Sequence, residues 1–295
     1  MSFINFILDI AHLLIDLLLR VYFKMTVLTP KKLQRTRSLQ NEKASDSQTL
    51  GYGELIGRFL NDSASRMRFR RNFQYRMILE HVNYRQGLAY RKRIIELGVV
   101  DFEQIKMLAQ SDFVGSPRRY YYSNMGWVSP TLLRYISVYS EIEKSIGFNN
   151  IHSVVEIGIG YGGQARVICN LAKISNYAFY DLNDVQKLAE YFLKSSSSHL
   201  SPRNLDIDSV ERESFDLAIS NYALSELPAH VQCEYLEKVL APARHCYMIM
   251  NSGASDRTKR SSGKLGQSDF VSGIRGVQVL PEIPSTGPDN YVLVK

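Results

Sequence analysis

The sequence predicts an α/β fold with a mostly parallel sheet and a helical N-terminal extension. From about residue 150, short apolar runs alternate with helix-length amphipathic segments, the pattern of parallel strands covered by helices. A glycine-rich turn directly follows the first of these runs. Earlier in the chain the pattern differs, because Phe69, Phe73 and Met77 recur at helical spacing within a strongly basic stretch.

The composition supports a globular protein. The chain has 295 residues, of which 45% are hydrophobic and 22% are charged, which excludes a disordered chain, a collagen-like repeat and a multi-span membrane protein. The net charge of +7 is local, because residues 24–93 alone carry sixteen basic and five acidic side chains. Cys169, Cys233 and Cys246 lack metal-type spacing, so we expect small buried hydrophobic residues in a reducing compartment.

Residues 1–24 are predicted to form an amphipathic helix. No positive segment precedes the apolar run 3–23 and no cleavage site follows it, so a signal peptide is disfavoured. Two interpretations stay open. The helix either lies on the inner face of a membrane or packs on its own domain or a second subunit, which would make a homo-oligomer. The basic residues that follow, Lys24, Lys31, Lys32, Arg35 and Arg37, support the first, and packing is the interpretation given the greater weight.

Residues 25–110 form the basic extension, and 111–150 a helical cap. Nine arginines interleaved with aromatic residues between Arg58 and Arg93 raise nucleic acid as a partner. We favour a solvated helical face with its aromatic residues turned inward and its arginines available for phosphate groups on a substrate or lipid. A nucleic-acid partner is therefore disfavoured, and an RNA-directed enzyme that uses this basic segment is kept as an alternative.

The domain 151–295 accounts for the alternating pattern. Strands are predicted at 153–157, 177–181, 215–220, 245–250, 276–280 and 291–294, with a weak one around 199–207. Helices are predicted over 164–173, from Asp184 and from Pro228. This is a Rossmann-like arrangement whose final strand we expect to be antiparallel.

The turn after the first strand predicts a nucleotide-type ligand. Gly158, Gly160 and Gly163 satisfy G-x-G-x-x-G, where glycines permit a sharp turn and close approach of a ligand to the backbone. A nicotinamide-dependent oxidoreductase is therefore an alternative. Asp181, at the end of the second strand, would hold ribose hydroxyls in either case. Glu156 argues against a dinucleotide, because a carboxylate close to the two phosphates of such a ligand is unfavourable.

Several motifs resemble those of a known enzyme family. E-x-G-x-G-x-G from Glu156 resembles motif I of the class I S-adenosylmethionine-dependent methyltransferases. EIGIGYGG, YDL at 180–182, SNYALSEL at 220–227, IMN at 249–251 and the segment 115–135 resemble the sugar O-methyltransferase family. The resemblance covers about residues 112–295. It implies methyl transfer from S-adenosylmethionine (SAM) to a hydroxyl of a nucleotide-linked sugar or surface glycan, in cytoplasmic polysaccharide synthesis.

The resemblance and the strand ends together assign the cofactor residues. Glu156, Gly158, Gly160 and Gly162 are expected at the methionine end of SAM and Asp181 at its ribose. Asp206 is expected near the adenine, in the turn 206–208, and Ser220 is expected at the end of the fourth strand.

Acceptor residues are expected at the same edge and in the cap. Arg118 and Arg119, beside Tyr120–Tyr122, are predicted to bind the acceptor together with Tyr222 and Asn251. Trp127 and Ser129 are predicted to form a lid.

Methyl transfer to a hydroxyl also needs a group that accepts a proton. Ligands bind at the carboxyl ends of parallel strands, and His152, His199 and His245 lie at strand starts, whereas His12 and His81 lie outside the core. Glu226 or His230 is therefore the predicted base, with Asn221 beside it. No proline follows Asn221, which disfavours methylation of a nucleobase amino group, and no spacing requires a metal. A non-catalytic binding protein on the same fold is a further alternative.

Overall fold

The protein is described here from a computed structural model. It describes residues 51–196, 201–207, 214–251, 263–288 and 290–295, together with ten positions between residues 3 and 18. The predicted basic cluster at 24–37 lies outside the described residues, as does Asp208.

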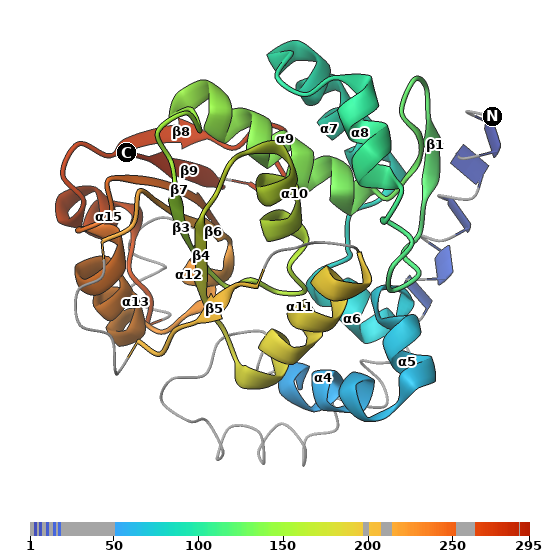
Figure 1. Ribbon diagram of the computed structural model, residues 1–295, viewed down its shortest axis with the longest axis horizontal. Helices are drawn as coiled ribbons and strands as arrows, with labels where there is room; N and C mark the ends of the chain where they lie inside the picture. Colours follow the sequence, from blue (N-terminus) through green and yellow to red (C-terminus); the bar gives the residue numbers. More distant parts are fainter. Residues whose placement is uncertain are drawn as a thin grey trace.

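A seven-stranded sheet forms the centre of the molecule (Figure 1). Its order is β5-β4-β3-β6-β7-β9-β8. The strands are β3 Ser153–Ile157, β4 Asn176–Tyr180, β5 Arg203–Asn204, β6 Leu217–Asn221, β7 His245–Met250, β8 Gln278–Pro281 and β9 Tyr291–Val294. Only β9 runs against its neighbours. The predicted α/β class, with a mostly parallel sheet and an antiparallel final strand, is confirmed.

Side chains that alternate along the strands build a core on each face of the sheet. Val154, Tyr177 and Phe179 face one core, under α9 Pro130–Ser145, α10 Gly163–Leu171 and α11 Asn183–Ser195. Val155 and Ile157 face the other, under α13 Ala229–Tyr235, the π-helical turn η2 Leu236–Leu240 and α15 Gln267–Gly273. Between β6 and α13 lies the short helix α12 Ala223–Glu226. Both faces are therefore covered, as a parallel sheet requires.

The extension is built of short helices instead of one long helical face. They are α4 Tyr52–Asn61, α5 Ser63–Met67, a 3₁₀ turn η1 Phe69–Arg71, α6 Phe73–Ile78, α7 Tyr84–Leu97 and α8 Phe102–Ala109. The expected stripe of Phe69, Phe73 and Met77 is wrong, because Asn72 interrupts the helix and caps α6, which leaves Met77 exposed. Residues of α4 join the same core as α10 and α11, and α4 lies against α11 (Figure 1).

A buried ion-pair network ties this extension to the cap. Arg70 pairs with Glu80 and with Asp112, the latter at 3.1 Å. Asp112 also accepts hydrogen bonds from the backbone and hydroxyl of Ser129, which caps α9. Ser129 is therefore a buried structural residue, which corrects its predicted place in a lid.

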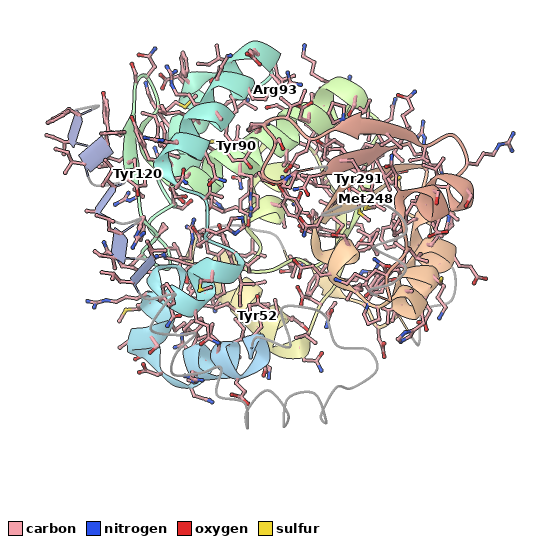
Figure 2. The ribbon with its side chains drawn as sticks, turned by 180° about the vertical axis from the view of Figure 1, so that it is seen from behind. Tyr52, Tyr90, Arg93, Tyr120, Met248 and Tyr291 are labelled. Carbon is pink, nitrogen blue, oxygen red and sulfur yellow. The ribbon has the colours of Figure 1, made fainter. Side chains whose placement is uncertain are left out.

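The hairpin formed by β1 Tyr120–Tyr122 and β2 Gly126–Val128 packs beside α7. In the reverse view, Tyr90 of α7 lies between Tyr120 of this hairpin and Met248 and Tyr291 of the sheet (Figure 2). Tyr120 and Tyr122 are buried, whereas Trp127 is exposed and stacks edge-on against Tyr121.

Two further expectations concern exposure. Cys246 is buried, but Cys233 is exposed on α13, so that cysteine is not the buried residue that was expected. Among the described residues, no helix combines the length and the apolar character that crossing a membrane requires.

Candidate active site

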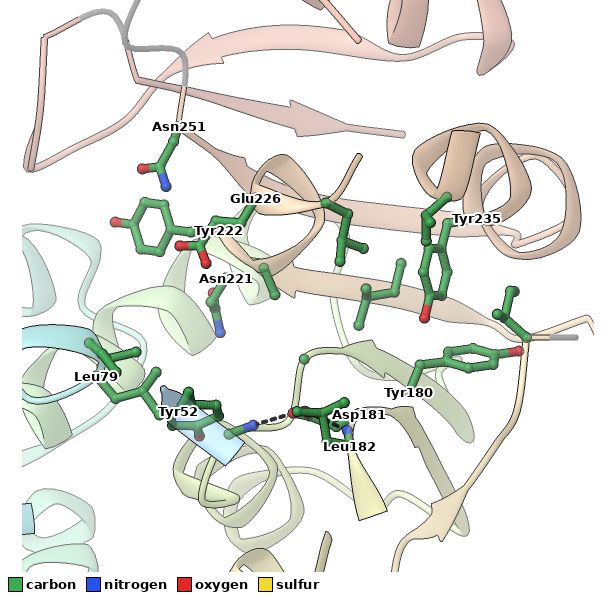
Figure 3. A pocket seen from close by; sticks show the side chains of 18 of the residues that line it. Tyr52, Leu79, Tyr180, Asp181, Leu182, Asn221, Tyr222, Glu226, Tyr235 and Asn251 are labelled. Carbon is green, nitrogen blue, oxygen red and sulfur yellow. Dashed lines mark hydrogen bonds between the residues drawn. The ribbon is translucent and has the colours of Figure 1, made fainter. Parts of the chain in front are cut away.

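One large cavity, of about 840 Å³, opens at the carboxyl edge of the sheet (Figure 3). Every strand from β3 to β7 ends at it, through Ile157 and Gly158, Tyr180 and Asp181, Asn204 and Leu205, Asn221, and Asn251. This is the edge at which ligands of open α/β sheets bind, and the volume is that of a small-molecule site.

The glycine turn forms the floor of the cavity. Gly158 has a φ of +83°, and a Cβ there would lie 2.3 Å from Cβ of Ala223, so the close approach of the turns after β3 and β6 requires glycine. The backbone N–H of Gly160 donates to Oδ2 of Asp181 at 3.1 Å. The N–H of Leu182 donates to Oδ1 of the same carboxyl at 2.8 Å. Asp181 is thus fixed by backbone groups.

Burial raises the pKa of Asp181 to about 6, and its backbone hydrogen bonds oppose that shift.

Two buried polar atoms of the cavity wall make no hydrogen bond with the described residues, and one buried cation there pairs with no carboxylate among them. The Tyr52 hydroxyl and Oδ1 of Asn204 are buried and make no hydrogen bond with the described residues, and Arg134 has no carboxylate partner among them. Unsatisfied buried polar atoms are costly, so these atoms mark places where a bound molecule would form hydrogen bonds.

The end of β6 supplies the opposite wall. Figure 3 shows Asn221, Tyr222 and Glu226 on one side of the cavity, across from Asp181. Tyr222 has a φ of +71°, an unfavourable conformation for a residue with a large side chain. Its backbone N–H donates to the Ile249 carbonyl, and its own carbonyl accepts from the Ser225 hydroxyl. Strain held in this way is typical of functional sites.

The loop after β8 closes this wall. The Tyr222 hydroxyl donates to Glu282, whose carboxylate also accepts from Thr286 and Asn290. Thr286 and Asn290 line the cavity. Burial raises the pKa of Tyr222 strongly, so this phenol is neutral.

Residues of the extension, which sequence reasoning placed outside the site, form its remaining wall. Tyr52 of α4, Ile78 and Leu79 at the end of α6, and His81 all line the cavity. His81 was set aside as lying outside the core, and the structure corrects this. A capped turn before α7, where Asn83 and Gln86 form a capping box, was the local signal that the chain changes direction here.

Several predicted site residues do line the cavity. They are Gly158, Gly160, Asp181, Asp206, Asn221, Tyr222, Glu226 and Asn251.

Glu156 does not line the cavity. Its side chain lies on the face of β3 that turns away from it, is 1% exposed, and accepts a hydrogen bond from the Tyr177 hydroxyl at 2.7 Å. Burial raises the pKa of this carboxyl to about 8. The predicted contact with the methionine end of SAM is therefore corrected, because strand alternation places Glu156 and Ile157 on opposite faces.

Other predicted residues also lie elsewhere. His230 is exposed on α13 and outside the cavity wall, which leaves Glu226 as the nearer of the two proposed bases. Ser220 is buried and bridges the Ile157 carbonyl to the N–H of Leu224. Gly162 begins α10 at a φ of +87° and packs against Leu193. Arg118 and Arg119, which precede β1, and Trp127, which lies on β2, are not part of the wall either.

In the part of the chain that the structure describes, no group of three or more His, Cys, Asp or Glu side chains is arranged to hold a metal ion. The polar lining consists instead of single carboxylates, amides, hydroxyls and one buried guanidinium.

No family model matches this sequence, and a comparison with curated proteins finds no match. Solved structures do resemble it. The mitomycin 7-O-methyltransferase MmcR is 14% identical, with a TM-score of 0.40 over 55% of this chain and 56% of its own. PigF, solved with SAH, is 12% identical, with a TM-score of 0.40 over 55% of this chain and 59% of its own. An S-adenosylmethionine-dependent methyltransferase from Clostridium acetobutylicum is 13% identical, with a TM-score of 0.40 over 52% of this chain and 88% of its own.

The chain thus spans a little over half the length of the first two proteins. At these identities and TM-scores the likeness says nothing of the activity of this chain.

Proposed function

We propose that this protein is a SAM-dependent methyltransferase that methylates a hydroxyl group, on a sugar or glycan acceptor. The observation that supports it most is the cavity at the carboxyl edge of the sheet. A glycine turn, Asp181 and the unpaired Oδ1 of Asn204 line this cavity, and they would hold the methionine, ribose and adenine portions of the cofactor. The sequence resemblance in residues 112–295 supports the sugar acceptor.

The residues present fit this cofactor. Asp181 and the Tyr52 hydroxyl would hold the ribose, since both face the same part of the cavity (Figure 3). Asn204 and Asp206 would accept hydrogen bonds from the adenine amino group. The glycine turn would run beneath the methionine portion.

When bound, SAM supplies a methyl group on a positively charged sulfur. The chain must hold an acceptor oxygen in line with that carbon, a contribution of up to about 7–11 kcal/mol, and remove the hydroxyl proton, which adds about 10²–10⁴-fold. In our proposal the Glu226 carboxylate accepts that proton as the oxygen–carbon bond forms and the carbon–sulfur bond breaks. Asn221, Asn251 and Tyr222 line the same cavity and would contact the acceptor.

Two alternatives stay open. Dinucleotide-binding sheets of the doubly wound type are also mostly parallel, so the cofactor that binds, which the calorimetry below measures, separates the nicotinamide alternative from this proposal. An RNA-directed enzyme would use the arginines of residues 58–93 at the surface, and two of these nine, Arg70 with its ion pairs and Arg76, are buried instead.

Calorimetry with SAM, S-adenosylhomocysteine (SAH) and NAD(H), followed by transfer of a tritiated methyl group to a panel of nucleotide sugars and lipid-linked glycans, tests the proposal. We expect binding of SAM and SAH and incorporation into at least one sugar. Tighter binding of NAD(H) than of SAM, or incorporation into RNA alone, would contradict it.

The base is tested separately. Glu226→Gln should lower kcat by about 10²–10⁴-fold while SAH affinity stays within a factor of three, because only proton removal is affected. His230→Asn is the matched control, since it is exposed outside the cavity, and should retain activity. If His81→Asn instead abolishes turnover and Glu226→Gln does not, the base is wrongly assigned.

A further inference from the structure

Arg134 is a buried cation in the wall of the cavity. It lies on α9, near the β6 end, and is 5% exposed. Its guanidinium lies 5.2 Å from the ring centroid of Tyr135, and the phenols of Tyr90 and Tyr222 are its other close electrostatic neighbours. An arginine keeps its charge at every physiological pH, so this site holds a permanent positive charge.

No carboxylate among the described residues pairs with this charge within 4 Å. The contrast with Arg70 is informative, because Arg70 is equally buried but pairs with both Glu80 and Asp112. A buried charge is unfavourable unless an opposite charge compensates it. Arg70 finds that compensation within the chain, whereas Arg134 does not.

Two carboxylates that line a small cavity together with Arg134 already have other partners. A second cavity of about 20 Å³ lies behind Tyr222, and Arg134, Glu141 and Glu282 all line it. Glu141 pairs with Arg93 at 2.5 Å. Glu282 accepts from Tyr222, Thr286 and Asn290. Each carboxylate therefore has its own donors, and Arg134, which also lines the large cavity, is left without a carboxylate partner among the described residues.

We propose that Arg134 binds an anionic group, a carboxylate or phosphate, of a ligand in the large cavity. Asn251 lines the same cavity and offers a neutral amide donor in addition to the guanidinium. The inference rests on the proposed function and sharpens it. The anion is either the carboxylate of the cofactor's methionine or an acidic group on the acceptor, which would then be a uronic acid or a phosphorylated sugar.

Two binding series on the wild-type protein distinguish these sources. The first compares SAM with decarboxylated SAM, which lacks only the carboxylate. The second saturates the protein with SAH and compares glucuronic acid and glucose 1-phosphate with neutral glucose. A preference of about 10- to 100-fold for the anionic member of a series identifies the source, since one charge-assisted contact is removed in each comparison. Equal binding within both series would overturn the proposal, whether or not any variant folds.

Arg134→Gln and Arg134→Lys then assign the effect to this residue. We expect Arg134→Gln to abolish the preference and Arg134→Lys to restore part of it. Arg244→Gln, an exposed arginine before β7, is the matched control and should change nothing. A preference that survives unchanged in Arg134→Gln refutes the assignment.

Failure of the proposed function is recognised separately. If the wild-type protein binds no adenosyl ligand, the proposed function fails, and inorganic phosphate then tests Arg134 alone. Thermal stabilisation by phosphate in the wild type that is lost in Arg134→Gln supports the anion site, and equal stabilisation of both proteins refutes it.

Discussion

At the scale of single residues, Asp181 links the cofactor site to pH. Its pKa is raised to about 6, so the carboxylate that accepts ribose hydrogen bonds is present above pH 6 and is lost below it. SAH affinity should therefore fall as the pH decreases from 7 to 5. Asp181→Asn should weaken binding at pH 7.5 by about 10- to 100-fold, equivalent to the ~1.5–3 kcal/mol of a hydrogen bond to a charged group.

Calorimetry at pH 5, 6, 7 and 8 measures both effects. Asp181→Asn should also flatten the pH dependence, because the titrating group is gone. Asp184→Asn, a half-exposed neighbour in the first turn of α11, is the control and should bind as the wild type does. A pH dependence that persists in Asp181→Asn would assign the titration to another group.

Glu156 predicts a different pH effect, on stability. Its pKa is raised from 4.5 to about 8 in the folded protein by burial, so the folded state holds the proton more tightly than the unfolded chain. The contribution of Glu156 protonation to the free energy of unfolding is fully present below about pH 4.5 and is lost progressively as the pH rises to 8. Each pKa unit corresponds to about 1.4 kcal/mol, so the loss amounts to a few kcal/mol.

Glu156→Gln keeps an acceptor for the Tyr177 hydroxyl but cannot ionise. The variant should match the wild type in Tm at pH 5 and exceed it at pH 8, with SAH affinity unchanged. Parallel Tm curves from pH 5 to 8 would show that the carboxyl does not titrate as described, and a large loss of SAH affinity would restore its predicted contact with the cofactor.

At the scale of elements, the sequence predicted what local patterns encode. The six strands predicted apart from the one around 199–207 all exist, with ends within two residues of the prediction, because apolar runs bounded by turns are local signals. The weak strand around 199–207 is only the two-residue β5, and α12 and α15 were missed because each is a short helix.

The cavity wall could be predicted only in part. Residues at strand ends were found, since topology places them at one edge. Tyr52 lines the same part of the cavity as Asp181, which comes more than a hundred positions later in the chain, and no spacing in the sequence encodes this proximity. For Glu156 the motif gave the position along the strand but not the face of the sheet toward which the side chain points.

The tie between the extension and the cap gives a prediction at the same scale. Arg70→Gln would leave Glu80 and Asp112 buried without their partner, which should destabilise the protein by about 3–5 kcal/mol in urea unfolding. SAH affinity should fall too, because Leu79 and His81, the sequence neighbours of Glu80, line the cavity and would shift with it. Arg58→Gln, exposed on α4, is the control and should change stability by less than about 0.5 kcal/mol. Equal stability of the two variants would contradict the importance of the network.

At the scale of the whole molecule, the excess positive charge lies in the N-terminal part of the chain, as do many of the exposed large apolar residues. The described residues of the first helix expose large apolar side chains, with Phe3 and Leu18 at 73% and 70%. Phe6 lies under the guanidinium of Arg85, 5.3 Å from ring centroid to carbon, so the segment also contacts α7. Both interpretations of this helix therefore have support, and the extent of its exposure favours a surface outside the chain.

We propose that this surface is an anionic membrane, because apolar side chains are followed in sequence by Lys24, Lys31, Lys32, Arg35 and Arg37. The protein should sediment with phosphatidylglycerol vesicles and much less with phosphatidylcholine vesicles, and 0.5 M salt should weaken binding. Replacing Leu14 and Leu18 with Asp should abolish it while SAH binding is retained. Val271→Asp, an equally apolar and half-exposed position on α15, is the control and should leave sedimentation unchanged. Wild-type protein that forms a stable dimer through this helix and ignores both vesicles would instead establish packing between subunits.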